Sequence, residues 1–174
     1  MNETIQTALN EQLALELSAS HTYLAMAAYA EGRNLGGCAR WMRLQSEEER
    51  AHALKIFDFI HDRDGQARLA ALPEPAPDFG SVREMFEAAL AHERKVTASI
   101  NRIYSLAVQE NDYPSQVLFQ WFINEQVEEE KQITQILDQL KLVGAEGLGL
   151  YLIDRELAGR QPEAAGAGEG DDER

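Results

Sequence analysis

Apolar residues recur at intervals of three, four and seven along four long stretches of the chain, which is the period of an amphipathic α-helix. The stretches cover residues 3–31, 35–62, 82–110 and 115–143. None of them shows the sustained alternation that is typical of a strand. A shorter fifth helix is expected at residues 148–158, after a glycine-rich hinge. The pattern therefore predicts an all-α domain that covers residues 1–159.

The connections between the four long helices differ in length. The first and third are short turns, whereas residues 63–80 form a long connection with three prolines and two glycines. Ser81 follows it as an expected N-cap, with Glu84 three residues later in the spacing of a capping box. Two hairpins of long helices joined by one long crossover are one of the known layouts of a four-helix bundle.

Each long helix interrupts its apolar face with one glutamate, seven residues from an apolar residue on either side. These are Glu16, Glu49, Glu93 and Glu129. His52 shares the face of Glu49, and Gln126 shares the face of Glu129. A buried carboxylate without a partner is costly, and four that converge would repel one another. A cation between them would remove that cost.

The four glutamates also lie at matching heights. Counted from the turns at about 1.5 Å per residue, they fall within about one helical turn of one another near the middle of the bundle. Glu49 and His52 form an ExxH motif, whose two side chains can reach one metal ion. A lone glutamate on such a face is more commonly a boundary residue, and ExxH alone is a weak signal. The combination favours a metal site, since carboxylates and imidazole suit hard or borderline cations.

Other polar residues near these positions leave alternatives open. Tyr23 lies seven residues after Glu16, where core packing is the simpler interpretation and a redox role at the metal is the alternative. Glu48, Glu125 and Glu128 adjoin the site residues. They are either solvated acids or ligands of a third metal position.

The net charge limits the classes of molecule that the protein is expected to bind. The 174 residues carry a formal net charge of -14, which disfavours binding to nucleic acid or to an anionic membrane. Metal cations are compatible with it, and so is a plain soluble surface. The single cysteine, Cys38, fits a reducing compartment, and we expect a cytoplasmic protein because neither a signal peptide nor a long apolar run is present. Residues 160–174 are expected to form an acidic disordered tail.

The chain resembles the ferritins, specifically the bacterial non-haem type, over about residues 3–159. The likeness rests on Glu16, on Glu93 and on three stretches: EERAH at 48–52, WFINEQVEEEK at 121–131 and GLYLIDREL at 149–157. It implies a ferritin-like four-helix bundle with a short C-terminal fifth helix. It also implies that Glu16, Glu49 and His52 hold one iron, and that Glu49 bridges to a second iron held by Glu93 and Glu129. The remaining implied site residues are Gln126 beside the second iron, and Glu48, Glu125, Glu128 and Glu129 at a third iron.

The resemblance implies iron storage and detoxification. Fe(II) would be oxidised at the di-iron ferroxidase site by dioxygen or hydrogen peroxide, with Glu49, Tyr23 and Gln126 taking part. Fe(III) mineral would be held in a homo-oligomeric cage of 24 subunits. No haem is expected, because Arg50 stands where bacterioferritins carry a haem-ligating methionine. Two alternatives remain: a di-iron oxidoreductase or peroxidase on the same bundle that stores no mineral, and a structural bundle that binds no metal.

Overall fold

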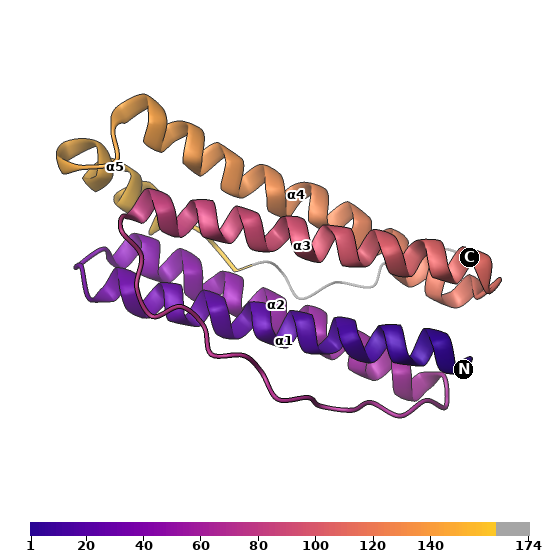
Figure 1. The fold of residues 1–174 in the computed structure, drawn as a ribbon. Coiled ribbons are helices and arrows are strands. Elements are labelled where there is room, and N and C mark those ends of the chain that lie inside the picture. Colours follow the sequence, from indigo (N-terminus) through magenta and orange to yellow (C-terminus); the bar gives the residue numbers. More distant parts are fainter. Residues whose placement is uncertain (163–174) are drawn as a thin grey trace, which may run out of the picture.

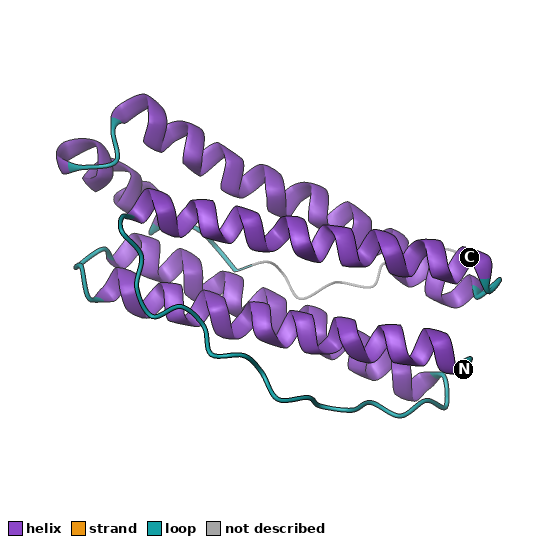
Figure 2. Ribbon diagram, in the orientation of Figure 1, coloured by secondary structure: helices purple, strands orange, loops and turns teal. Residues whose placement is uncertain are grey.

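The computed structural model describes residues 1–162, and within that range it contains five helices and no strand (Figure 2). The helices are α1 (Glu3–Glu31), α2 (Gly36–Asp62), α3 (Val82–Gln109), α4 (Tyr113–Val143) and α5 (Gly147–Leu157). The expected all-α class is confirmed, and every helix begins and ends within two residues of its expected bounds. Residues 163–174, which make up most of the expected acidic tail, lie outside the described residues.

The four long helices form two hairpins that lie against each other (Figure 1). One hairpin pairs α1 with α2, the other pairs α3 with α4, and α1 also packs against α3. The crossover of residues 63–80 runs along the outside of the first hairpin from the end of α2 to the start of α3 (Figure 1). The architecture is the four-helix bundle with a short fifth helix that the connection lengths predicted.

Local capping fixes where the helices begin. The side chain of Asn2 accepts a hydrogen bond from the Thr4 amide, and Ser81 accepts one from the Glu84 amide. Asp112 caps α4, so Pro114 falls inside the first helical turn rather than before it. That position suits proline, since the first amides of a helix have no intrahelical acceptor. This is why α4 begins two residues earlier than expected.

Helix α5 packs against the start of α2. The Oδ1 atom of Asp154 accepts a hydrogen bond of 2.8 Å from the backbone amide of Cys38, in the first turn of α2. The residue before α2, Leu35, supplies no side-chain cap, so α5 provides the acceptor that this helix end lacks. Gly37 allows the contact, because a Cβ there would lie 1.6 Å from the Asp154 carbonyl oxygen.

The core is divided into two hydrophobic clusters with a polar layer between them. On every long helix, the residues of one cluster precede the layer and those of the other follow it. The layer consists of buried polar side chains: Gln12, Glu16, Gln45, Glu49, His52, Glu93, Gln126 and Glu129. It therefore lies near mid-bundle, where the helix counting placed the glutamates. In the described range, 1–162, each helix is too short or too polar to cross a membrane.

Candidate metal centre

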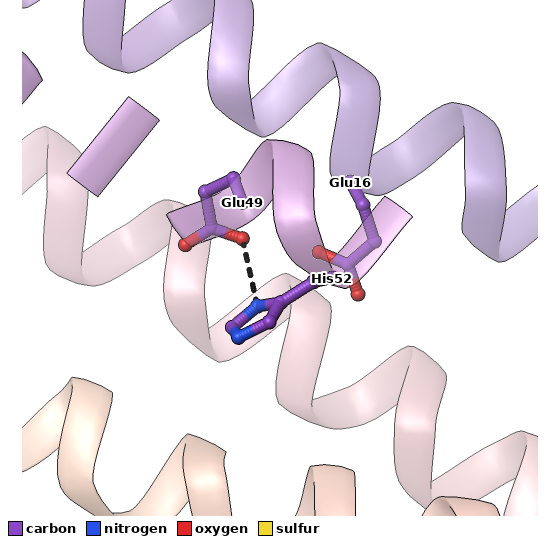
Figure 3. A group of neighbouring side chains, drawn as sticks. All are labelled: Glu16, Glu49 and His52. Carbon is purple, nitrogen blue, oxygen red and sulfur yellow. Dashed lines mark ion pairs between the residues drawn. The ribbon is translucent and has the colours of Figure 1, made fainter. Parts of the chain in front are cut away.

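Helices α1 and α2 bring together Glu16, Glu49 and His52 (Figure 3). One possible ligand atom from each residue lies within 4.8 Å of the other two. The His52 Nδ1 atom lies 3.5 Å from Glu49 Oε2, and all three side chains are buried. The spacing of three residues between Glu49 and His52 turns both side chains to the face that Glu16 approaches from α1.

This group has buried carboxylate oxygens with few partners in the protein. Glu16 Oε1 accepts a hydrogen bond of 2.7 Å from Gln12, and Glu49 Oε1 accepts one of 3.0 Å from Gln45. The Oε2 atom of Glu16 is buried without a hydrogen-bond partner, and the Oε2 atom of Glu49 has only the His52 imidazole, at 3.5 Å. Such atoms are costly unless a cation binds them. Two carboxylates and one imidazole form a donor set that fits iron and other borderline divalent ions.

Gln45 connects this group to α4. Its Nε2 atom donates both to Glu49 and, over 2.6 Å, to Glu129 Oε2. The amide thus holds two carboxylates from different hairpins beside each other. Glu129 is buried, as its place on the apolar face of α4 predicted.

Glu93, from α3, is held by two neighbours. The hydroxyl of Tyr23 donates to Glu93 Oε1 in a short hydrogen bond. Gln126 Nε2 donates to Glu93 Oε2 over 3.1 Å. The α3 carboxylate is thus held from α1 by Tyr23 and from α4 by Gln126. Tyr23 is buried, as the core-packing interpretation predicted, and its hydroxyl has Glu93 as a polar partner.

The protonation of the cluster reflects its burial. Burial, together with the charge of Glu49, raises the pKa of Glu16 and of Glu129. The same two causes raise the pKa of Glu93 to about 8. Burial acts in the same sense on Glu49, but the hydrogen bond and charge of His52 outweigh it and lower the Glu49 pKa. The same pairing outweighs the burial of His52 and raises its pKa. Without metal, the centre is thus an ion pair of Glu49 and His52 among carboxyl groups that favour protonation.

The acids expected at a third metal position lie at the border of this centre. Glu48 is 12% exposed, and Glu125 is close enough for its charge to raise the pKa of His52. Glu128 is exposed and pairs with Lys131 over 3.1 Å. The structure thus places Glu48 and Glu125 beside the buried residues and Glu128 farther out, on the surface of α4.

A family model described as the ferritin-like domain matches residues 6–143, which is most of the chain. The chain belongs to the ferritin family. It is similar to the bacterial non-heme ferritin of Staphylococcus saprophyticus, with 39% identity over 92% of this chain and 96% of that relative. It is 37% identical to the bacterial non-heme ferritin of Escherichia coli O6:H1 over 86% of this chain and 91% of that relative.

Solved ferritin structures have the same fold as this family member. An open pore ferritin from Archaeoglobus fulgidus matches it with a TM-score of 0.91 and 38% identity, over 92% of this chain and 98% of that one. A structure described as a humanized archaeal ferritin gives a TM-score of 0.91 with 37% identity. The resemblance to bacterial non-haem ferritins that the sequence motifs indicated is confirmed.

Three polar residues of this ferritin-family centre were not predicted from the sequence. Gln12 and Gln45 each lie four residues before a site glutamate, on the same helix face, and that spacing was a usable signal. Arg160 reaches the centre from beyond α5 and donates to Gln45 over 3.0 Å. No periodicity marked it, because it lies in the segment that composition assigned to a tail.

Replacing Glu16 with glutamine is expected to stabilise the metal-free protein. Burial and the charge of Glu49 raise the folded-state pKa of Glu16 above its ordinary value of 4.5. The wild-type protein therefore loses stability as the pH rises above that value, because the unfolded chain releases this proton more readily. Glutamine does not ionise, and its side-chain oxygen can still accept the hydrogen bond from Gln12. The gain should be absent at about pH 4 and present at pH 8.

Thermal unfolding of metal-free Glu16→Gln and wild-type protein at both pH values measures this gain. At pH 8 the variant should melt at least ~2 °C higher, the change that about 1 kcal/mol produces in a chain of this size. An equal shift at both pH values would show that the effect does not come from ionisation of Glu16.

Proposed function

We propose that this ferritin-family chain stores iron by oxidising Fe(II) at the buried centre and holding Fe(III) as mineral. The observation that carries the proposal is the buried group of Glu16, Glu49 and His52, in which Glu16 Oε2 has no hydrogen-bond partner. Relatives with 37–39% identity are named bacterial non-heme ferritins, which supports iron as the metal. The subunits would form a closed homo-oligomeric cage, with 24 as the expected number. The buried free thiol of Cys38 is compatible with the reducing cytoplasm.

Two Fe(II) ions would bind side by side as substrates. Glu16, Glu49 and His52 would hold the first, and Glu49 would be shared with the second, which Glu93 and Glu129 would hold. Gln126 would act at the second ion by keeping Glu93 in place, as its 3.1 Å hydrogen bond indicates. The second position has no imidazole among these residues, so we expect it to hold its ion less tightly and to release Fe(III) for storage.

The electron balance is simple for either oxidant. Two Fe(II) ions would lose one electron each, and dioxygen would take both electrons with two protons to give hydrogen peroxide. Hydrogen peroxide as oxidant would take two electrons and two protons to give two water molecules. The carboxylates of the centre favour the more highly charged Fe(III), which supplies part of the driving force. The raised pKa values of Glu16 and Glu129 favour their protonated forms, and metal binding would favour release of those protons.

A third iron position is part of the proposal. Glu48, Glu125, Glu128 and Glu129 would provide its carboxylates. The charge of Glu48 contributes to the raised pKa of Glu129, which supports their proximity. An ion there would lie between the buried centre and the surface, on a path along which iron could leave the oxidation site.

The test is addition of Fe(II) to the purified full-length protein without oxygen, followed by air. Fast oxidation of about two Fe(II) ions per chain, then retention of hundreds in a large soluble particle, is the expected result. Absorbance follows the oxidation and light scattering gives the particle size. Oxidation that stops at two or three ions on a small oligomer would instead indicate the non-storing di-iron oxidoreductase. Absence of fast oxidation would contradict the proposal.

Tyr23 is expected to supply one electron to dioxygen in a single turnover. Together with one electron from each Fe(II) of the pair and one from an Fe(II) at the third position, four electrons and four protons would reduce dioxygen to two water molecules. Burial, with the charge of Glu93, raises the pKa of its phenol, so the group stays protonated until it is oxidised. Its proton would then pass along the hydrogen bond to Glu93. Freeze-quenched electron paramagnetic resonance should detect a transient tyrosyl radical that Tyr23→Phe removes. The same signal in Tyr23→Phe would assign the radical to another residue.

A further inference from the structure

The side chain of Arg160 is packed against the metal centre from outside the bundle. Its Nη2 atom donates to Glu48 Oε2 over 2.5 Å, and its Nη1 atom donates to Gln45 Oε1 over 3.0 Å. Its Cζ atom lies 4.4 Å from the centroid of the Trp41 ring, and Nη1 lies 3.4 Å from the Trp41 carbonyl oxygen. Both Arg160 and Glu48 are only 12% exposed. Charge-assisted bonds in such a shielded place are stronger than surface ion pairs.

Gln45 transmits this contact into the centre. A guanidinium has donors only, so the Gln45 atom that it contacts must be the amide oxygen. The Gln45 nitrogen is therefore directed the other way, toward Glu49 and Glu129, to which it donates over 3.0 and 2.6 Å. Arg160 thus fixes the orientation of an amide that holds two of the expected iron ligands.

Glu48 is expected to bind a metal ion as well as Arg160. It is an expected ligand of the third metal position, and its negative charge acts on Glu129. The guanidinium already supplies a positive charge to Glu48 at that position. A metal ion that binds Glu48 competes with Arg160, because each cation offsets the negative charge that attracts the other.

The attachment of Arg160 allows such an exchange. The residue lies three positions beyond the end of α5, and its backbone amide donates to the Leu157 carbonyl over 3.1 Å. Its own carbonyl accepts a hydrogen bond of 3.3 Å from Arg40. The backbone is therefore anchored on both sides, and departure of the guanidinium requires only rotation of a long side chain.

We propose that Arg160 is a tethered cation that occupies the third metal position in the metal-free protein and yields it to a metal ion during loading. The inference rests on the proposed function, since it concerns the third position of that site. Arg160 is a positioning residue in this scheme. It holds Gln45 and Glu48 in place, neutralises Glu48 until iron arrives, and weakens binding at the third position.

The test uses calorimetric titration of the metal-free full-length protein with Zn(II), which binds the same donor types without redox chemistry. Arg160→Gln should tighten the third position by about tenfold or more, since it removes one shielded charge-assisted contact. Arg155→Gln is the matched control, because it removes the same charge from an exposed side chain on α5. It should leave the third affinity within about twofold of wild type.

Two further variants test whether the tighter Zn(II) binding depends on Glu48 and on the charge at position 160. The double variant Arg160→Gln with Glu48→Gln should lose the gain in affinity at the third position, because the carboxylate for which the guanidinium and the metal ion compete is gone. Arg160→Lys keeps the charge but not the two-pronged contact, so it should tighten the third position by an intermediate factor. It also serves as the test if Arg160→Gln does not fold.

An unchanged third affinity in the Arg160 variants would overturn the inference, and so would an equal gain in Arg155→Gln. The Fe(II) oxidation assay distinguishes failure of the proposed function from failure of the tethered-cation inference. Wild-type protein without a fast two-iron phase would mean that the proposed function fails. A normal fast phase with no effect of Arg160 on Zn(II) binding would mean that only the tethered-cation inference fails.

Discussion

Glu49→Ala is expected to abolish fast Fe(II) oxidation, lowering the initial rate at least ~100-fold, because loss of a shared ligand exceeds the cost of losing an outer hydrogen-bond partner. Glu49 is the carboxylate that the two proposed iron positions share. It lies 3.5 Å from His52 and accepts a hydrogen bond from Gln45, which also donates to Glu129 on α4. Stopped-flow absorbance after mixing Fe(II) protein with air measures the rate.

Glu47→Ala is the matched control for this variant. Glu47 is on the same helix, two residues earlier, and its side chain is exposed. It should oxidise Fe(II) at a rate within about twofold of wild type. Circular dichroism and particle size establish that both variants fold and assemble. A Glu49→Ala protein that is folded and still oxidises Fe(II) at the wild-type rate would rule out the assigned centre.

Gly37→Ala is expected to displace α5 and to destabilise the protein strongly. A Cβ at this position would lie 1.6 Å from the Asp154 carbonyl oxygen and 3.0 Å from the Ala158 amide nitrogen. Both are backbone atoms, so no side-chain rotation relieves the clash. Moving α5 away also breaks the hydrogen bond from the Cys38 amide to Asp154. Overpacking of about 3 kcal/mol lowers the melting temperature by roughly 6–12 °C in a chain of this length.

Gly36→Ala provides the comparison for Gly37→Ala. The two glycines are neighbours at the start of α2, but a Cβ at Gly36 meets no atom within 4 Å. Alanine also has the higher helix propensity, so this variant should melt at or slightly above the wild-type temperature. Equal melting temperatures for the two alanine variants would show that α5 does not pack tightly on Gly37.

The helices and the buried glutamates followed from local and periodic signals. Glutamate on an apolar helix face is conspicuous because it breaks the seven-residue repeat, as Glu16 and Glu93 do. Helix ends followed from capping residues such as Ser81, whereas the start of α4 was expected two residues too late because Pro114 lies inside its first turn. These signals depend on residues within a few positions of one another, which a single sequence displays.

The contacts that organise the surroundings of the centre could not be predicted in the same way. Gly37 and Asp154 meet although they are 117 positions apart, and Arg160 reaches Gln45 from 115 positions away. Nothing in the spacing of residues encodes such pairings, because they depend on how α5 is placed against α2. The hydrogen bond from Gln45 to Glu129 likewise needs the relative positions of two hairpins.

The most direct test of the central claim is a crystal structure of the protein loaded with Fe(II) in the absence of oxygen, with anomalous scattering measured at the iron edge. We expect two iron peaks inside each subunit. One should contact Glu16, Glu49 and His52, and the other should contact Glu49, Glu93 and Glu129. Iron peaks that all lie outside the polar layer between the two hydrophobic clusters would contradict the account.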